Sequence, residues 1–471
     1  MNASKELRFD VVVIGGGPGG QKAAVQASKA GKRVLLVDRE SAVGGECVHR
    51  GTIPSKTLRQ CGLNYMHWTQ NFVDRAAGER CELAMATLLK RQSAVTQAHE
   101  RYMSRQMERN RIVIWRGHAS FTGPHELEVK AVDGSRRRVA ADVVVIETGS
   151  RPRTPPNVPV DHENILDSDS ILSLAYLPQS MIVLGAGVIA CEFASVFAAL
   201  GVKVTLVDKG DRPLAFLDGE LTTRFVAEFG KLGGQFLGRR SIAKVEFDGV
   251  SQVELTLENG EVLRADKLLC ALGRVAQVNG LGLDKAGLAV NPRGTLDVDE
   301  HCATSMPGIY AVGDVIGPPA LAATSMEQGR RAVRHALGLP PLSVSSTTPV
   351  GIYTIPEMSS VGMTEAEVAA RFGSAFVGRA KFAELARGHI NGDEGGLLKL
   401  VCDPSGRKLL GAQILGDGAT ELIHVAQMAI ATGQDIDVFI DNVFNFPTFA
   451  EAFLVAALDV LEQRQQLAKA A

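Results

Sequence analysis

The sequence predicts an α/β chain in which two strand, glycine-turn and helix units precede an α+β end domain. Short apolar runs at residues 10–14 and 180–184 each lead into a glycine-rich turn and then into a helix-compatible segment. A second strand completes each unit, at residues 33–37 and 203–207. From about residue 343 the pattern changes to alternating strands and helices, which indicates a separate end domain.

The length and composition fit a multi-domain chain that binds small molecules. At 471 residues, and with about 150 residues per domain, the chain is long enough for roughly three compact units. The 49 glycines and the 5% aromatic content are typical of a chain with many βα turns and an aliphatic core. Because the formal net charge is −2, no nucleic-acid or polyanion partner is expected.

The N-terminal residues and the cysteines indicate a cytoplasmic protein. The first eight residues are polar and charged, and they lack the apolar core of a signal peptide. The seven cysteines show no paired spacing, so neither a disulfide framework nor a metal motif is expected. They are Cys47, Cys61, Cys81, Cys191, Cys270, Cys302 and Cys402.

Residues 181–202 raise the alternative of a membrane span, because Glu192 is the only charged residue among them. The glycine turn inside this run favours a strand followed by a helix instead. No membrane partner is therefore expected.

The first unit has the pattern of a dinucleotide-binding fold. Gly15, Gly17 and Gly20 permit a tight turn, a close approach of the backbone to a pyrophosphate, and close packing of helix on strand. Asp38 follows the second strand, where an acid accepts a hydrogen bond from a ribose hydroxyl. A lone glycine motif is a weak signal, but the complete βαβ context makes it specific.

The next segments predict packing elements rather than a cofactor site. Residues 82–110 read as a long amphipathic helix, with Leu88, Val95 and Tyr102 at heptad spacing. Such a stripe more often packs on a core or on another subunit than binds a ligand. Residues 111–130 then alternate as a small sheet does.

The first domain is expected to close near residue 150. A strand at residues 142–146 ends in a turn at Gly149. Prolines crowd residues 151–159, which indicates a linker.

The second unit repeats the dinucleotide pattern with one change. Gly185 and Gly187 occupy the first two positions of the turn, and Ala190 replaces the third glycine, which the contact of helix and strand tolerates. Asp208 follows the last strand of this unit.

The residues after this strand carry a mixed signal about the nucleotide. Asp208 would accept a hydrogen bond from an unmodified ribose 2′-hydroxyl, which favours NAD. Lys209 and Arg212 follow closely, and a cation there can receive the 2′-phosphate of NADP. A solvated charged loop is the alternative.

A further strand with a Gly-Asp turn, at residues 304–314, comes after the second unit. Two dinucleotide folds imply two dinucleotides, and a returning segment would complete the first fold. We therefore predict Rossmann-like dinucleotide-binding domains at residues 1–150 and 151–280, a returning segment at 281–345, and the α+β domain at 346–471. Within the last domain the expected strands are 351–355, 396–401 and 411–414, and the expected helices are 421–432 and 450–465.

Taken together, these motifs resemble the pyridine-nucleotide-disulfide oxidoreductases over the whole chain. The stretches that carry the resemblance are 15–20, 44–56, 185–190 with Glu192, 308–314 and 445–451. Within that family the chain looks most like the members that exchange hydride between NADPH and NAD⁺ (Si-specific type), through residues 51–56, 167–173, 214–218 and 354–357. The resemblance also implies that the C-terminal domain makes a homodimer or a larger homo-oligomer.

The resemblance implies two ligand sites. For FAD it points to Gly15, Gly17, Gly20, Asp38, Gly45, Cys47, Thr52, Lys56, Gly149 and Asp314. For the nicotinamide nucleotides, NAD(H) and NADP(H), it points to Gly185, Gly187, Glu192, Asp208, Lys209, Arg212 and Gly273. Asp314 would accept hydrogen bonds from the ribityl hydroxyls. Lys56 and Glu192 resemble the pair that flanks flavin N5, with a plain salt bridge as the alternative.

Two departures from the family bear on the reaction. The disulfide reductases carry a second cysteine at the position of Thr52 and a histidine base at the position of Phe446. Cys47 remains, and so does Glu451, the residue that would orient that base. Because a single thiol makes no intrachain disulfide, there is no dithiol for a base to serve, and the two losses agree with each other.

We therefore expect an enzyme in which NADPH delivers hydride to flavin N5 and NAD⁺ later takes it back at the same nucleotide site. The alternatives are an NAD(P)H dehydrogenase or diaphorase that reduces a quinone or another acceptor, and a non-catalytic flavoprotein with a structural or regulatory role. Cys47 would remain as a small packed thiol. The direction of transfer stays open.

Overall fold

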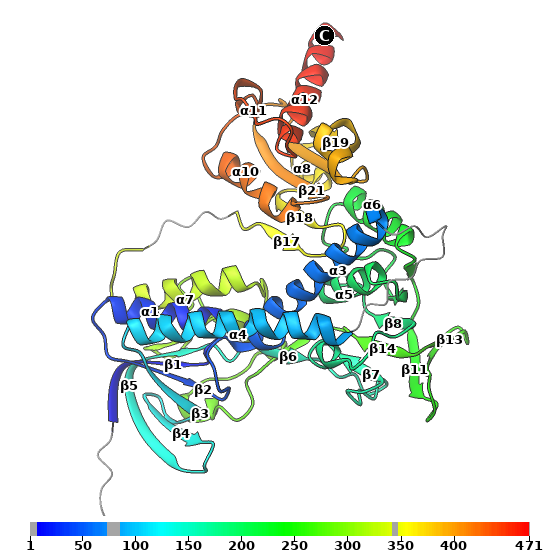
Figure 1. Cartoon of the computed structure of the whole chain (residues 1–471). Helices are drawn as coiled ribbons and strands as arrows, with labels where there is room; N and C mark the ends of the chain where they lie inside the picture. Colours follow the sequence, from blue (N-terminus) through cyan, green and yellow to red (C-terminus); the bar gives the residue numbers. More distant parts are fainter. Residues whose placement is uncertain (1–6, 73–84, 342–346, 471) are drawn as a thin grey trace, which may run out of the picture. The chain divides into compact units, whose positions relative to one another are not determined.

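The chain folds as two compact units, each assembled from separate stretches of sequence. The computed structural model describes residues 7–72, 85–341 and 347–470 (Figure 1). The first unit takes its described residues from 7–57, 87–153 and 273–341, and the second takes the remainder. The four domain ranges drawn from the sequence remain a prediction.

The first unit is built on a six-stranded sheet. Pairing is parallel along β16, β5, β1, β2 and β3, whereas β4 pairs antiparallel with β3 and β5. Since β16 lies against β5 with Ile309 opposite Val144, a segment distant in sequence contributes to this sheet. The strands are β1 (Leu7–Ile14), β2 (Val34–Asp38), β3 (Val113–Gly123), β4 (Glu126–Ala131), β5 (Arg136–Ile146) and β16 (Ile309–Ala311).

Both faces of β1 are buried, so its side chains alternate between two hydrophobic clusters. Val11 and Val13 belong to one cluster, and Val12 and Ile14 belong to the other. The helices α1 and α7 lie side by side (Figure 1), and a Cβ at Gly329 would stand 2.1 Å from the Gly19 carbonyl oxygen. The helical elements are α1 (Pro18–Lys29), α2 (Gly45–His49), α3 (Thr52–Phe72), α4 (Met85–Arg109), η3 (Leu283–Ala286), η4 (Gly313–Ile316) and α7 (Ala322–Ala336); α3 continues into the second unit.

The second unit contains a parallel five-stranded sheet in the order β10, β9, β8, β14, β7. Three antiparallel strands, β11 to β13, share a hydrophobic cluster with it. Its elements are β7 (Ile165–Asp167), η2 (Ser170–Ser173), β8 (Ser180–Leu184), α5 (Val188–Ala199), β9 (Lys203–Val207), α6 (Gly219–Lys231), β10 (Gln235–Leu237), β11 (Ile242–Phe247), β12 (Val253–Leu257), β13 (Val262–Ala265) and β14 (Lys267–Cys270).

The apolar run at residues 181–202 therefore forms a strand, a turn and the short helix α5. Over the described ranges, none of the helices combines the length and the apolar character that a bilayer crossing requires.

The proline-rich stretch after residue 150 is not only a linker. β6 (Ser150–Pro152) pairs antiparallel with β15 (Arg274–Ala276), and Arg153 N–H donates to the Gly273 carbonyl oxygen at 3.0 Å. The chain thus leaves and re-enters the first unit as a paired ribbon.

The C-terminal part of the second unit is an antiparallel sheet in the order β17, β18, β21, β20, β19. Helices α10 and α12 contribute Ile423 and Phe453 to the hydrophobic cluster that covers it. The elements are β17 (Val350–Ile352), β18 (Met358–Gly362), α8 (Glu365–Phe372), β19 (Phe376–Lys381), η5 (Phe382–Glu384), α9 (Ala386–Asn391), β20 (Leu397–Cys402), β21 (Leu409–Leu415), α10 (Ala419–Ala431), α11 (Val438–Asp441) and α12 (Glu451–Ala470).

The long helix expected at residues 82–110 is α4, although residues 82–84 and Cys81 lie outside the described residues. Leu88 is buried, but Tyr102 is 58% exposed, so the expected heptad stripe does not pack along its whole length.

A buried ion cluster ties α6 to the C-terminal sheet. The side chain of Lys399 on β20 is only 3% exposed, and its Nζ lies 2.9 Å from Asp218 Oδ2 and 2.6 Å from Glu365 Oε2. Asp218 also caps α6 by accepting from Glu220 N–H. Because the Lys399 ammonium and the Asp218 carboxylate are both buried, each charge is stable only while the other is present.

We expect Lys399→Ala to lower the free energy of unfolding by about 3–5 kcal/mol, because Asp218 would be left buried without its cation. Thermal unfolding of the purified protein measures this as a lower Tm. Lys231→Ala is the matched control, since its Nζ pairs with Glu228 at 2.8 Å but the Lys231 side chain is 69% exposed. That variant should lose less than about 1 kcal/mol. Equal losses in the two variants would contradict the importance assigned to burial.

Candidate dinucleotide-binding sites

The first glycine turn leaves no room for side chains. Gly15 has a φ of +106°, and a Cβ there would stand 2.0 Å from the Glu147 carbonyl oxygen. A Cβ at Gly20 would stand 2.0 Å from the Gly15 carbonyl oxygen. Gly17 is the N-cap of α1 and supplies no side-chain cap. This is the arrangement that a pyrophosphate needs.

The stretch after β2 packs onto this turn. Asp38 Oδ2 accepts from Gly16 N–H at 2.5 Å, and burial raises the pKa of the Asp38 carboxyl. Gly45 has a φ of +58°, and a Cβ there would lie 2.7 Å from the Gly17 Cα. The segment that carries Cys47 is therefore held against the turn by backbone contact.

Cys47 and Thr52 face each other where a disulfide reductase would hold two cysteines. Burial raises the pKa of the Cys47 thiol, and the nearby Thr52 side chain opposes this effect only in part. Cys47 is a free thiol and forms no disulfide. Lys56 follows one turn after Thr52 on α3. A protonated thiol beside a hydroxyl is a poor nucleophile and cannot cycle as a disulfide.

The other side of this site contains a hydrogen-bonded relay. Ser150 Oγ donates to Asp314 Oδ2 at 2.6 Å, and Arg274 Nε donates to Ser150 Oγ at 2.7 Å. Gly149 has a φ of +69°, and a Cβ there would meet nothing within 4 Å. Asp314 is thus oriented by two residues that the sequence does not point to, and space remains beside Gly149.

Glu147 is a second residue for which the sequence suggests no role. It lies at the end of β5, and its carboxyl Oε1 accepts from Ser325 Oγ at 3.3 Å. Burial, with the added charges of Asp314 and Asp38, raises its pKa to about 8. A Cβ at Gly17 would lie 2.5 Å from Glu147 Oε2, so this glycine also accommodates the carboxyl. The only sequence signal is an acid that ends an apolar strand.

The second glycine turn repeats the first with more open space. Gly185 has a φ of +98°, and a Cβ there would stand 2.7 Å from the Ala271 carbonyl oxygen. Gly187 is the N-cap of α5, without a side-chain cap. A Cβ at Gly187, or at Gly273 with its φ of +104°, would meet nothing within 4 Å. The space beside the α5 N-terminus fits a dinucleotide.

Glu192 on α5 is buried and fixed by backbone. Its Oε1 accepts from Tyr353 N–H at 2.8 Å, and Ser195 Oγ accepts from Ile355 N–H at 3.0 Å. Arg59 holds the same segment, because its NH1 lies 2.9 Å from Glu357 Oε1. Glu192 belongs to the second unit and Lys56 to the first, so their pairing remains a prediction.

The residues after β9 form a loop that is held by local hydrogen bonds. Asp208 Oδ1 accepts from Gly210 N–H at 2.6 Å, and Lys209 is exposed. The Arg212 guanidinium donates to the carbonyl oxygens of Leu217 at 3.0 Å and Ala215 at 2.6 Å. Arg212 therefore stabilises the 214–218 loop, and its role toward a 2′-phosphate stays a prediction.

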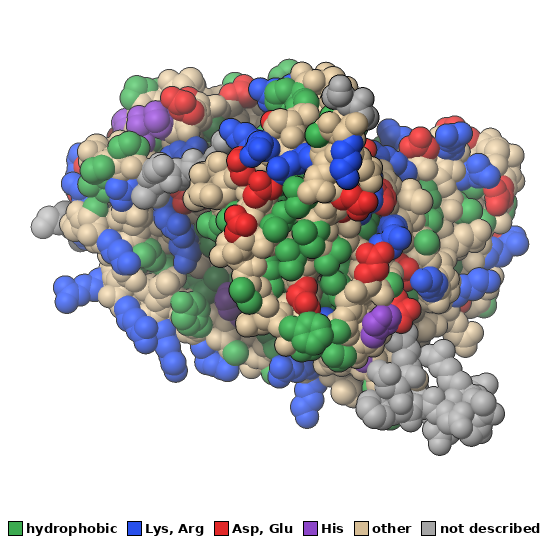
Figure 2. All heavy atoms as spheres, turned by 90° about the horizontal axis from the view of Figure 1, so that it is seen from above, with side chains coloured by type: hydrophobic (Ala, Val, Ile, Leu, Met, Phe, Trp, Pro, Cys, Tyr) green, Lys and Arg blue, Asp and Glu red, His purple; other side chains and the backbone are tan. Residues whose placement is uncertain are grey.

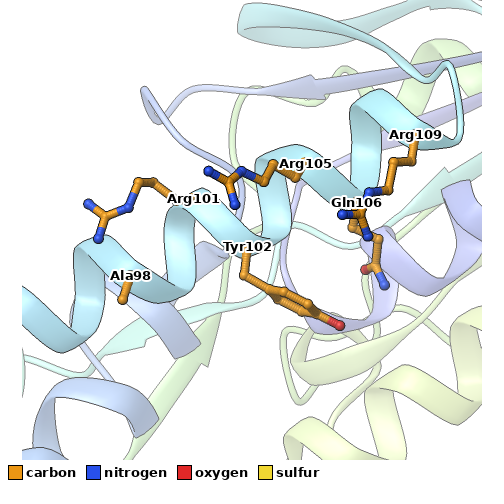
Figure 3. A pocket seen from close by; sticks show the side chains of 6 residues that line it. All are labelled: Ala98, Arg101, Tyr102, Arg105, Gln106 and Arg109. Carbon is orange, nitrogen blue, oxygen red and sulfur yellow. The ribbon is translucent and has the colours of Figure 1, made fainter.

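A hollow on α4 contains none of these residues. It has a volume of about 270 Å³ (Figure 3) and is lined by Ala98, Arg101, Tyr102, Arg105, Gln106 and Arg109. Within the part of the chain that the structure describes, no three His, Cys, Asp or Glu side chains are grouped as a metal site would require.

Two family models match the chain. The model described as pyridine nucleotide-disulphide oxidoreductase matches residues 9–329, and the dimerisation domain of the same family matches residues 348–457. All residues considered for either ligand lie within the first match.

The sequence relatives share one name. Soluble pyridine nucleotide transhydrogenases of Mycobacterium tuberculosis and Mycobacterium bovis are 44% identical over 463 residues, which is 98% of this chain and 98% of theirs. The protein of that name from Hahella chejuensis is 40% identical, over 97% of this chain and 99% of its own.

Two solved structures have the same fold. LpdA from Mycobacterium tuberculosis superposes with a TM-score of 0.87 at 26% identity, over 96% of this chain and 99% of its own. The HOCl-induced flavoprotein disulfide reductase RclA from Escherichia coli has a TM-score of 0.86 at 27% identity, over 96% and 99%.

Glu147 predicts a pH-dependent stability. Because its carboxyl binds a proton more tightly when folded, the free energy of unfolding falls as pH rises from about 4.5 to about 8 and then levels off. Glu147→Gln removes this titration. Its stability relative to the parent should therefore grow through that window, by at most about 1.4 kcal/mol per pH unit.

Unfolding midpoints measured from about pH 5 to pH 9 test this slope. Glu258→Gln is the control, because Glu258 is exposed and its difference from the parent should stay flat. A pH-independent difference for Glu147→Gln would mean that this carboxyl does not titrate as described.

Proposed function

Because the chain belongs to the pyridine nucleotide-disulphide oxidoreductase family, we propose that it is an FAD-dependent enzyme that transfers hydride between NADPH and NAD⁺. The C4–H bond of the NADPH nicotinamide breaks, and a C4–H bond forms in NADH. The electron pair travels with the hydrogen, so the balance needs no external oxidant and no proton. The observation that carries the proposal is the pairing of Cys47 with Thr52 in place of a dithiol.

The residues of the first site fit FAD. When bound, FAD supplies a ring that accepts a hydride from one nicotinamide and returns it to another. The bare N-terminus of α1 offers backbone N–H groups to the pyrophosphate, and Asp38 accepts from the adenosine ribose. Asp314, oriented by Ser150, accepts from the ribityl chain. Gly45, held at the turn, keeps the Cys47 segment close to the ligand.

The second site serves both nicotinamide nucleotides in turn. Gly185 and Gly187 leave the space for a dinucleotide beside the α5 N-terminus. Glu192 is fixed by Tyr353 N–H, so its carboxylate keeps one orientation while the nucleotides exchange. A single site for donor and acceptor implies that the oxidised product leaves before the second nucleotide enters. This order is ping-pong, and it requires positioning and charge rather than acid–base chemistry.

Lys56 provides the cation of the proposal. Its ammonium would favour negative charge on the flavin ring, and Glu192 would orient the ring and the nicotinamide. Cys47 takes no part in electron transfer, since its raised pKa keeps the thiol protonated. We assign the transfer to the Si-specific type, in which the pro-S hydrogen moves.

We further propose a cytoplasmic homodimer or larger homo-oligomer. The dimerisation domain matches residues 348–457, and in that region Phe446 is 75% and Val443 is 99% exposed. Figure 2 shows hydrophobic side chains gathered near the centre of one face, with charged side chains around them. A face of this kind is typical of a subunit contact. A monomer by light scattering at working concentration would exclude this assembly.

The mechanism predicts opposite sensitivities for two neighbouring residues. In anaerobic stopped-flow, the flavin absorbance of Cys47→Ser should bleach with NADPH and recover with NAD⁺ at close to the parent rates, because the thiol carries no electrons. Lys56→Met should slow the reaction at least about tenfold, because the stabilising cation is lost. NADPH deuterated at the pro-S position should slow bleaching, whereas the pro-R isotopomer should not.

The controls separate folding from chemistry. FAD content and Tm of both variants must match the parent before the rates are compared. Loss of recovery in Cys47→Ser, with both steps retained in Lys56→Met, would overturn the disulfide-free mechanism. If the reduced flavin of the parent enzyme were reoxidised by a quinone and not by NAD⁺, the chain would be a diaphorase instead.

A further inference from the structure

The loop after β10 brings two arginines to the acid of the nucleotide site. β10 pairs in parallel with β9, with Leu237 opposite Val207, so the carboxyl ends of both strands meet at one edge. Ligands of open α/β sheets bind outside this edge. The segments that follow the two strands, 208–212 and 238–240, therefore lie side by side on the ligand side of the sheet.

Backbone hydrogen bonds lock these two segments together. Asp208 N–H donates to the Leu237 carbonyl oxygen at 3.1 Å, and Arg240 N–H donates to the Asp208 carbonyl oxygen at 2.9 Å. Arg239 N–H donates to the Gly210 carbonyl oxygen at 2.8 Å. A Cβ at Gly238 would stand only 2.9 Å from that same oxygen. The positions of both arginines are thus set relative to Asp208.

The two guanidinium groups are only weakly engaged. Arg239 has a φ of +55°, a left-handed conformation that a side chain rarely adopts, and its side chain is 79% exposed. Its NH2 lies 3.8 Å from Asp211 Oδ2. Arg240 Nε is buried without a hydrogen-bond partner and lies 3.6 Å from Glu261 Oε2. By contrast, the Arg212 guanidinium is bound to the carbonyls of its own loop.

We infer that Arg239 and Arg240 bind the adenosine 2′-phosphate of NADP(H), at the same ribose whose free 2′-hydroxyl Asp208 accepts in NAD(H). This inference rests on the proposed hydride exchange. It implies that one nucleotide site recognises NAD(H) and NADP(H) in two different ways. A 2′-phosphate is a dianion that takes charge-assisted hydrogen bonds from two guanidinium groups. Asp208 remains fixed by Gly210 N–H in either mode.

Neither arginine belongs to the positions that the dinucleotide motif identifies. The motif identifies the acid and the cations directly after the second strand, which are Asp208, Lys209 and Arg212. Arg239 and Arg240 follow the third strand, and only the parallel pairing of β9 with β10 brings them to Asp208. Lys209, exposed on the first segment, is a further cation at this edge.

Calorimetric titration of the FAD-loaded protein with two nucleotide fragments tests the assignment without turnover. The probes are adenosine 2′,5′-bisphosphate and adenosine 5′-monophosphate, which differ by the 2′-phosphate. Arg239→Ala and Arg240→Ala should each weaken binding of the bisphosphate by about tenfold to a hundredfold, while the monophosphate affinity changes little. Arg240→Lys should recover part of the loss, because it restores the charge without the planar fork.

Arg264→Ala is the matched control, since that exposed arginine on β13 pairs with Glu254 away from the Asp208 loop, and it should bind both probes as the parent does. Arginine variants that bind the bisphosphate as tightly as the parent, or that lose both probes equally, would overturn the assignment. A parent that shows the expected binding pattern but transfers no hydride would support the phosphate site and refute the proposed function. The two failures are therefore distinguishable.

Discussion

Backbone contact at two glycine turns is the constraint on which both ligand sites depend. At the carboxyl end of β1, Gly15 and Gly20 are so close to neighbouring carbonyl oxygens that any side chain would force the helix away from the strand. Gly185 has the same role at the end of β8. These contacts leave the N-termini of α1 and α5 without side-chain caps, and so leave backbone donors for a phosphate ligand.

The charges around the two turns are arranged differently. The first site contains a buried carboxyl, Glu147, next to Asp38 and Asp314, and burial with mutual repulsion keeps it protonated near neutral pH. The second has acids fixed by backbone N–H groups, Glu192 by Tyr353 and Asp208 by Gly210, with cations on the adjoining loop. A protonated Glu147 adds no negative charge beside a resident pyrophosphate. A second site with both signs of charge suits nucleotides that differ by one phosphate.

Much of the fold could be predicted from the sequence, because strand, glycine turn and helix follow one another locally. β8 and β9 coincide with the expected runs, and the family and the pyridine nucleotides follow from the same motifs. Features that depend on pairing between distant segments could not be predicted. The β6 and β15 ribbon inside the expected linker, the relay from Arg274 through Ser150 to Asp314, and the approach of Arg239 to Gly210 each join residues far apart in sequence. The hydrogen bonds of the Arg212 guanidinium to nearby carbonyl oxygens could not be predicted either, because the sequence distance from Asp208 does not show them.

In the proposed reaction the bound FAD is the only redox centre, so the enzyme stores two electrons per chain and uses no disulfide. Anaerobic titration of the FAD-loaded protein with NADPH counts those electrons directly. Hydride exchange predicts complete bleaching at one equivalent of NADPH per bound FAD, and full recovery after one equivalent of an NAD⁺ analogue with no third substrate. A requirement for two equivalents of NADPH would reveal a second two-electron centre, such as a disulfide, and would contradict the claim.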